Sequence, residues 1–241
     1  MARHGISSLK PPLILAIENS TMCGSVAIVS PDICLAELSI TSPTTHSRRL
    51  LGAIDTVLEN ASLKIEDVDA IAISLGPGSF TGIRIGLTTA KGLAFATQKP
   101  LIGINTLDAL AAQVGMTSSL ICAMLDARKK EVFAAFYTTS SAQQLDRCSE
   151  LLSVPIASIY QTISEPVLFV GDGSLLYKTE LQDSLGLMAS FAPHEICYPR
   201  ASAVGMLAIG QWHSNNFLNP ASASPSYVRP SDAEICYKKK K

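Results

Sequence analysis

The same order of sequence elements occurs twice in the chain, and this repeat constrains the fold more than any other feature. In residues 13–29 an apolar run ends at the acid Glu18, a polar turn follows, and a second apolar run begins. Residues 120–137 show the same pattern, with Asp126 as the acid. Short apolar runs bounded by turn residues are typical of strands. Each half therefore predicts a hairpin whose first strand ends in a carboxylate.

A second shared pattern follows in the same order within each half. The apolar run 71–74 leads into a G-P-G-S turn and a helical stretch, and the run 167–170 leads into a G-D-G-S turn. Two such coincidences in one order indicate a duplicated unit, which changes the fold that the sequence predicts. We predict an α/β protein of two similar lobes that face each other across a cleft.

The connections between the runs predict mixed sheets and a lobe boundary. A strand, a helix and a strand follow one another over residues 69–104, and this order implies a right-handed crossover with parallel pairing. We expect the first lobe to span 1–105 and the second 106–241. Whether the last segment packs back on the first lobe stays open.

Composition allows a large core and excludes several classes of protein. Of 241 residues, 47% are hydrophobic and 16% charged, and 19 Lys+Arg oppose 20 Asp+Glu. This balance excludes a disordered tail and argues against an autonomous nucleic-acid binder. Soluble domains average about 25% charged residues, so either Ser and Thr or a partner covers part of this surface. We find no signal peptide or membrane span, and expect a cytoplasmic protein.

The glycine-rich turn before the long helix has two interpretations. Gly76 and Gly78 allow a positive φ, and the free N–H groups at the helix start, beside Ser79, attract anions. The spacing matches neither the dinucleotide nor the P-loop pattern, so a purely structural turn is the favoured alternative. Gly171 and Gly173 occupy the corresponding turn of the second half.

Glu18 and Asp126 also have two interpretations. A carboxylate at the end of a strand can hold a metal-bound nucleotide or a water, or it can accept hydrogen bonds from N–H groups of the turn, which is the favoured interpretation. The four histidines and six cysteines show no metal-ligand spacing, so we predict no metal site. No catalytic motif such as G-x-S-x-G is present.

The long helix carries a ridge of small residues. Gly82, Gly86 and Ala90 are spaced four apart, so they line up on one face and let another backbone approach closely. Ile83 and Leu87 cover neighbouring positions. The ridge either packs within its own lobe or also meets a second subunit, and the pattern alone does not decide.

The run from Gly76 to Ala94 resembles the signature of the TsaB (YeaZ) family. The similarity covers most of the chain, from residue 13 to residue 229. Other matching segments are the strand 13–17 with Ser20-Thr21, His46 with the helix behind it, Asp126-Ala127-Arg128, and the closing motif Pro225-Ser226-Tyr227-Val228-Arg229.

This resemblance implies a fold and a function. The fold is the actin-like, Hsp70-like ATPase fold with two ribonuclease-H-like lobes, and the function is synthesis of N6-threonylcarbamoyladenosine at position 37 of tRNA. In that family TsaB is a noncatalytic scaffold and dimerisation subunit, a TsaD-type paralogue transfers the threonylcarbamoyl group, and a TsaE-type ATPase joins them. The tRNA is contacted through the complex, and the free chain is a homodimer.

The resemblance also implies what the chain itself binds. It implies that this chain requires no cofactor, while ATP or ADP has a place at the interface of the complex. The candidate nucleotide or anion contacts are Glu18, Ser20, Thr21, Gly76, Gly78, Ser79, Asp126, Gly171 and Gly173. The candidate subunit interface consists of His46, Leu50, Ile54, Gly82, Ile83, Gly86, Leu87 and Ala90, on helices at about 46–61 and 80–97.

Two departures from the family pattern weaken the nucleotide expectation. The family usually has Asp where this chain has Glu18, and often Arg where this chain has Leu75. An independent ATPase or kinase-like enzyme, or a peptidase-like enzyme of the same fold, is the alternative function, because kinases of this fold use acids and glycine-rich turns to bind a magnesium nucleotide.

Overall fold

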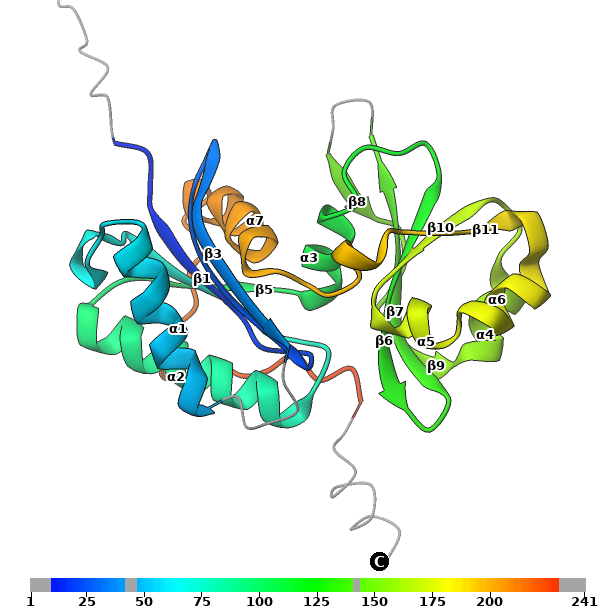
Figure 1. Cartoon of the computed structure of the whole chain (residues 1–241), viewed down its shortest axis with the longest axis horizontal. Coiled ribbons are helices and arrows are strands. Elements are labelled where there is room, and N and C mark those ends of the chain that lie inside the picture. The colour runs from blue at the N-terminus through cyan, green and yellow to red at the C-terminus, as the bar shows by residue number, and fades with distance from the viewer. Residues whose placement is uncertain (1–9, 42–46, 141–143, 230–241) are drawn as a thin grey trace, which may run out of the picture.

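The first apolar run of the sequence forms the central strand of a five-stranded sheet (Figure 1). All five residues of this strand are buried, as expected for a strand covered on both faces. The computed structural model describes residues 10–41, 47–140 and 144–229. The sheet has the order β3-β2-β1-β4-β5, with β1, β2 and β3 antiparallel and β1, β4 and β5 parallel. Its strands are β1 (Ile14–Glu18), β2 (Cys23–Ser30), β3 (Ile33–Thr41), β4 (Ala70–Ser74) and β5 (Leu101–Ile104).

The second half builds a sheet of the same kind. Its order is β11-β10-β6-β7-β8, and β9 also pairs with β7. The hairpin β6–β7 is antiparallel, whereas β6, β10 and β11 are parallel. Its strands are β6 (Leu120–Arg128), β7 (Glu131–Thr139), β8 (Leu145–Arg147), β9 (Leu152–Pro155), β10 (Val167–Val170) and β11 (Ala189–Phe191). The predicted α/β fold of two similar lobes with mixed sheets is confirmed.

One strand ends later than the sequence predicts. We expected a turn directly after Asp126, but β6 continues to Arg128, and Asp126 pairs with Val132 in the hairpin. The turn consists of Lys129 and Lys130. Arg128 and both lysines have positive φ angles, which matches the left-handed geometry of a tight hairpin turn.

Helices cover both faces of each sheet. In the first lobe α1 (Ser47–Asn60) and α2 (Phe80–Thr97) pack on one face, and in the second lobe α4 (Ile156–Thr162) and α6 (Lys178–Leu185) do so. The short α5 (Asp172–Leu176) follows β10. Within the described ranges, none of the helices combines the length and apolar character that crossing a membrane requires.

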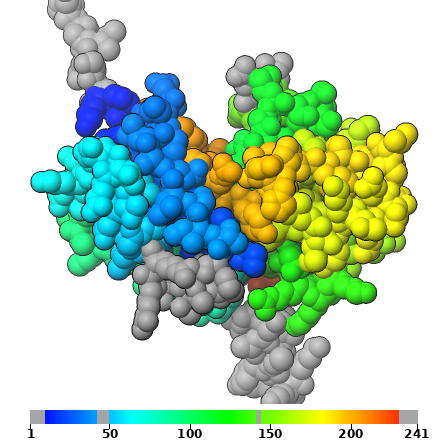
Figure 2. All heavy atoms as spheres, viewed as in Figure 1, coloured from blue at the N-terminus to red at the C-terminus, as the bar shows by residue number. Residues whose placement is uncertain are grey.

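The last helix of each half packs on the sheet of the other half. α3 (Thr106–Ala112) follows β5 of the first sheet, but Leu107 and Leu110 belong to the core of the second lobe. α7 (Ala201–His213) follows the second sheet, but Val204 and Ala208 pack on the free face of the first. Figure 2 shows the orange segment that leads into α7 covering the junction of the lobes. The two halves thus exchange helices.

Polar side chains fix the position of α7. The first N–H groups of a helix have no partner inside it, and here Ala201 N donates to Ser25 Oγ at 3.2 Å and Ser202 N to Glu37 Oε1 at 2.9 Å. Both acceptors lie on strands of the first lobe. The helix is therefore capped by the lobe onto which it crosses.

The chain then follows the surface of the first lobe as a C-terminal strap, which we define as residues 215–229. Leu218 N donates to Leu101 O at 2.8 Å, and the Nζ of Lys91 donates to Ala223 O at 3.1 Å. Residues on both sides of the predicted boundary near residue 105 therefore contribute to the first lobe.

Two alanine substitutions in α7 test its close packing. A Cβ at Gly205 would lie 2.5 Å from Cγ2 of Val29 and 3.1 Å from Cβ of Ala16. Overpacking of this kind costs about 1–3 kcal/mol, so Gly205→Ala should lower the free energy of unfolding by about that amount in urea titrations. A Cβ at Gly210 would meet no atom within 4 Å, so Gly210→Ala should instead raise stability by about 0.5–1 kcal/mol. Equal effects of the two would contradict the packing.

Candidate functional site

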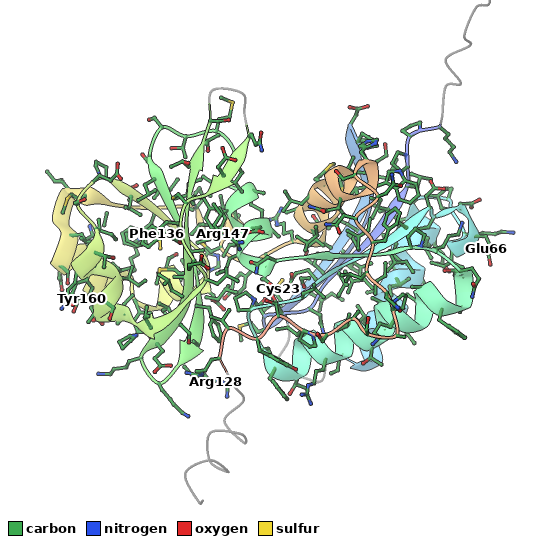
Figure 3. All side chains as sticks on the ribbon, turned by 180° about the vertical axis from the view of Figure 1, so that it is seen from behind. Cys23, Glu66, Arg128, Phe136, Arg147 and Tyr160 are labelled. Atoms are coloured by element: carbon green, nitrogen blue, oxygen red, sulfur yellow. The ribbon has the colours of Figure 1, made fainter. Side chains whose placement is uncertain are left out.

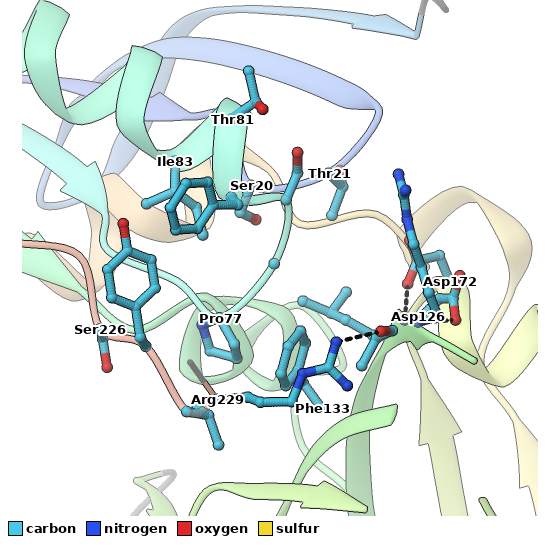
Figure 4. Close-up of a pocket in the computed structure, with 18 of the residues that line it drawn as sticks. Ser20, Thr21, Pro77, Thr81, Ile83, Asp126, Phe133, Asp172, Ser226 and Arg229 are labelled. Atoms are coloured by element: carbon cyan, nitrogen blue, oxygen red, sulfur yellow. Dashed lines mark hydrogen bonds between the residues drawn. The ribbon is translucent and has the colours of Figure 1, made fainter. Parts of the chain in front are cut away.

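The two lobes and the C-terminal strap line an open cavity of about 810 Å³ (Figure 4). Its walls come from the β1–β2 turn, the first turn of α2, the end of β6, and the strap. The residues that line it are Ser20, Thr21, Met22, Pro77, Gly78, Ser79, Phe80, Thr81, Ile83, Arg84, Leu125, Asp126, Ala127, Arg128, Phe133, Asp172, Ser226, Tyr227, Val228 and Arg229.

The first-lobe wall consists of two turns packed together. Ser79 N donates to Ser20 O at 2.6 Å, and Ser79 Oγ caps α2 by accepting from Gly82 N at 3.3 Å. Gly78 has a φ of 148°, and a side chain there would overlap Ser20. Glycine is therefore required so that the turn before α2 can lie directly on the β1–β2 turn.

Glu18 lies behind this wall and does not line the cavity. Its side chain is buried, and Oε1 accepts from Ser20 N at 2.5 Å. Burial raises the pKa of this carboxyl above its usual value, although the hydrogen bond from Ser20 N acts in the opposite direction. Its Oε1 binds the N–H of its own turn, so the nucleotide contact predicted at Glu18 stays a prediction.

Two carboxyl groups form the second-lobe wall. Asp126 N donates to Asp172 Oδ1 at 3.0 Å, and Asp126 Oδ1 accepts from Arg128 N at 2.8 Å. Desolvation raises the pKa of Asp172 to about 6, and the nearby Asp126 carboxylate adds to the rise. Asp172 is not among the predicted contacts, although it is the variable residue of the second G-x-G-S turn.

Three of the predicted glycine contacts lie in closely packed turns outside the cavity lining. A side chain at Gly171 would overlap the carbonyl of Met124, and a Cβ at Gly173 would lie 3.0 Å from the carbonyl carbon of Leu125. Gly76 accepts from Thr106 N at 2.9 Å. These glycines bring α5 and α3 close to the strands and do not line the cavity. Of the nine predicted contacts, five line it, namely Ser20, Thr21, Gly78, Ser79 and Asp126.

Aromatic and cationic side chains that line the cavity are not among the nine predicted contacts. The rings of Phe80 and Tyr227 stack at 5.2 Å between centroids, and the guanidinium carbon of Arg84 lies 3.8 Å from the Phe80 centroid. Figure 3 shows Arg128 at the hairpin end next to the strap. Phe80 and Arg84 lie within the recognised glycine-rich run, but their contacts with Tyr227 span most of the chain.

The ridge of α2 faces its own lobe. A Cβ at Gly86 would lie 3.1 Å from Cβ of Asn19, and one at Gly82 would overlap the Asn19 carbonyl. The Nδ2 of Asn19 donates to Gly82 O at 2.8 Å. In this structure the ridge therefore packs within its own lobe, against Asn19.

The remaining predicted interface residues are also covered by their own lobe. Leu50, Ile54, Ile83, Leu87 and Ala90 are all buried, so they offer no surface to a second subunit. His46 lies outside the described residues.

Other residues form the exposed faces of these two helices. On α2 they are Thr81, Arg84, Thr88, Gly92 and Phe95, which recur at helical spacing and form one stripe. Phe95 is 76% exposed, and Leu51 on α1 is 55% exposed. Among the described residues, no group of three or more His, Cys, Asp and Glu could hold a metal ion.

Comparison with known sequences finds relatives along most of the chain. Residues 40–237 match the family described as TsaD, tRNA N6-adenosine threonylcarbamoyltransferase. The tRNA threonylcarbamoyladenosine biosynthesis protein TsaB of Bacillus subtilis is 29% identical over 92% of this chain and 96% of that protein. TsaB of Haemophilus influenzae is also 29% identical, over 94% and 96%. TsaB of Escherichia coli is 36% identical over 52% of this chain and 54% of that protein.

Solved structures give the same result. YeaZ from Pseudomonas aeruginosa superposes with a TM-score of 0.75 and 26% identity, covering 90% of this chain and 100% of that one. A second Pseudomonas aeruginosa structure, described as a protein with similarity to the peptidase YeaZ, gives a TM-score of 0.76 at the same identity and coverage.

The raised pKa of Asp172 predicts a pH-dependent stability. Its folded pKa of about 6 exceeds the ordinary value of 3.8, so the folded state binds more protons between these values and stability falls as the pH rises through that window. Asp172→Asn keeps the acceptor for Asp126 N and removes this cost. The variant should exceed the wild type in free energy of unfolding by up to about 3 kcal/mol at pH 8, with the difference shrinking towards pH 4.

Urea titrations at several pH values check this prediction, and Asp183→Asn on the exposed face of α6 is the control, with little effect expected at any pH. A constant difference between Asp172→Asn and the wild type from pH 4 to pH 8 would contradict the assignment.

Proposed function

Because this chain belongs to the TsaD family, and within it to the TsaB (YeaZ) group, we propose that it is a noncatalytic subunit in the synthesis of N6-threonylcarbamoyladenosine in tRNA. A role in the biosynthesis of this nucleoside follows from relatives named TsaB that align with 92% and 94% of the chain. The proposal adds that another subunit, of the TsaD type, carries out the transfer.

The position of Glu18 supports the noncatalytic role. This acid ends the first strand of the first lobe, but it is buried, and its carboxylate accepts from Ser20 N in the turn. The equivalent acid of the second lobe, Asp126, lines the cavity. The cavity therefore receives carboxyl groups from the second lobe, while this first-lobe acid is engaged in holding its own turn.

The exposed faces of α1 and α2 are the surface that we propose for the TsaD-type partner. Outside the cavity lining, the α2 stripe consists of Thr88, Gly92 and Phe95, none of which is charged, whereas α1 exposes Asp55 and Glu59 beside Leu51. Interfaces are depleted of charged residues at their centres and enriched in aromatic residues, and Phe95 is the most exposed aromatic side chain among the large hydrophobic residues described. This surface replaces the buried ridge as the proposed interface.

The remaining partners follow from the same proposal. A TsaE-type ATPase joins the complex, ATP or ADP binds at the interface of the subunits, and tRNA is bound by the assembly. In the absence of the partner, the same surface pairs two copies of the chain as a homodimer. The chain itself needs no cofactor for this role.

Charge substitutions on the proposed surface test the partner interface. Leu51→Glu and Phe95→Glu place a carboxylate where a partner would desolvate it, so each should weaken association with the TsaD-type subunit about tenfold or more in calorimetric titrations. Leu187→Glu makes the same change at a fully exposed site of the second lobe and should leave the affinity unchanged. Wild-type affinity in both surface variants would contradict the interface.

The function is tested by the nucleoside content of tRNA. In cells depleted of the native protein, N6-threonylcarbamoyladenosine should fall, and the Glu18→Gln variant should restore it as well as the wild type does, because glutamine keeps an acceptor for Ser20 N. Mass spectrometry of digested tRNA measures both results.

The alternative is an independent ATPase or kinase-like enzyme, favoured by the two carboxyl groups, Asp126 and Asp172, in a cavity of about 810 Å³. Steady turnover of ATP by the purified chain alone, lost in Asp126→Ala, together with unchanged modification of tRNA in depleted cells, would overturn the proposed function in favour of this one.

A further inference from the structure

The C-terminal strap contacts both lobes. On the first lobe, Ser226 N donates to Leu75 O at 2.8 Å. Beyond it, the guanidinium of Arg229 donates to the carboxylate of Glu131 and, at 3.2 Å, to Ala127 O. These two acceptors belong to the β6–β7 hairpin of the second lobe, and Figure 4 shows Arg229 reaching from the strap towards it. The strap thus links the lobes in addition to the two chain crossings.

Tyr227 holds the strap to the first lobe. Its ring stacks on Phe80 at 5.2 Å, and its hydroxyl accepts from Nε of Arg84 at 2.8 Å. Both partners lie in the first turns of α2. Within the closing motif, residues 225–229, Tyr227 therefore contacts the first lobe and Arg229 contacts the second.

The position of the strap relative to the chain crossings matters. The chain passes between the lobes at α3 and again just before α7. Gln113, at the end of α3, links these two crossings: its side chain donates to Tyr198 O at 3.0 Å and accepts from Arg200 N at 2.6 Å. Figures 1 and 3 show the end of the strap at the edge of the lobes away from α3 and α7. Strap residues 226–229 line the cavity. The lobes are thus joined covalently on one side and by the strap on the other.

We propose that the strap is a releasable clasp. Arg229 holds the lobes closed around the cavity, and breaking its contacts lets them rotate about the junction of α3 and α7, as hinged lobes do around their shared cleft. The side chains of Arg229 and Glu131 are 22% and 33% exposed, and a partly solvated ion pair of this kind contributes modestly. The clasp can therefore open without unfolding either lobe. This inference does not rest on the proposed function.

Distances between the lobes of the full chain test the clasp. Spectroscopic labels on unnatural amino acids at Asp55 of α1 and Asp183 of α6, both exposed, report the separation of the lobes. Arg229→Met and Glu131→Gln should each show a second population at longer distance that the wild type lacks. Combining Arg229→Glu with Glu131→Arg should shift the distribution back towards that of the wild type.

A matched control separates the clasp from a general loss of charge. Arg147→Met removes an ion pair of 3.5 Å to Asp108, which lies within the second lobe, and should leave the distances unchanged. Unfolding midpoints of all variants identify any that do not fold; if Arg229→Met fails to fold, Glu131→Gln decides. Wild-type distances in folded Glu131→Gln and Arg229→Met would overturn the proposal.

Discussion

The exchange of helices between the two halves is the constraint on which the rest of the structure depends. The free face of the first sheet is lined by small residues such as Ala16 and Ala27, and it is covered by α7 from the other end of the chain. The corresponding face of the second sheet is covered by α3. A sheet with one uncovered apolar face is unstable in water, so neither half completes its core alone. The walls of the cavity are held in place by this shared core.

The two lobes use glycine for the same purpose but present different chemistry to the cavity. In the first lobe Gly78 and Gly82 let the start of α2 lie on the β1–β2 turn, and in the second Gly171 and Gly173 let α5 lie on β6. The acid of the first lobe, Glu18, is buried behind its turn, whereas Asp126 and Asp172 of the second lobe line the cavity. The shared geometry is therefore that of the turns, whereas the polar groups differ between lobes, which is consistent with a chain that works through a partner.

The periodic parts of the fold were predictable from sequence. The buried strands and the long helix follow from runs of apolar residues and from helical spacing, and their repeated order gave the two lobes. The direction of the α2 ridge was not predictable, because Gly82 and Gly86 suit close approach by any backbone, and only the folded chain shows that Asn19 occupies the space.

The residues of the site were predicted less well, for related reasons. A carboxylate at the end of a strand can point into the turn or into the cleft, so one pattern selected both Asp126, which lines the cavity, and Glu18, which does not. The strap has no periodicity, and its contacts join Arg229 to Glu131, 98 residues earlier. Interactions of that range leave no local pattern in a single sequence.

The central claim is that this chain supports tRNA modification through its outer helical surface and not through chemistry in its cavity. The most direct measurement is the rate of N6-threonylcarbamoyladenosine formation by the reconstituted complex with two variants of this chain, one altered in the cavity by Asp126→Asn and one on the surface by Phe95→Glu. The account predicts a wild-type rate with the cavity variant and a loss of activity with the surface variant at equal concentrations. Loss of activity with the folded cavity variant, and a wild-type rate with the surface variant, would contradict it.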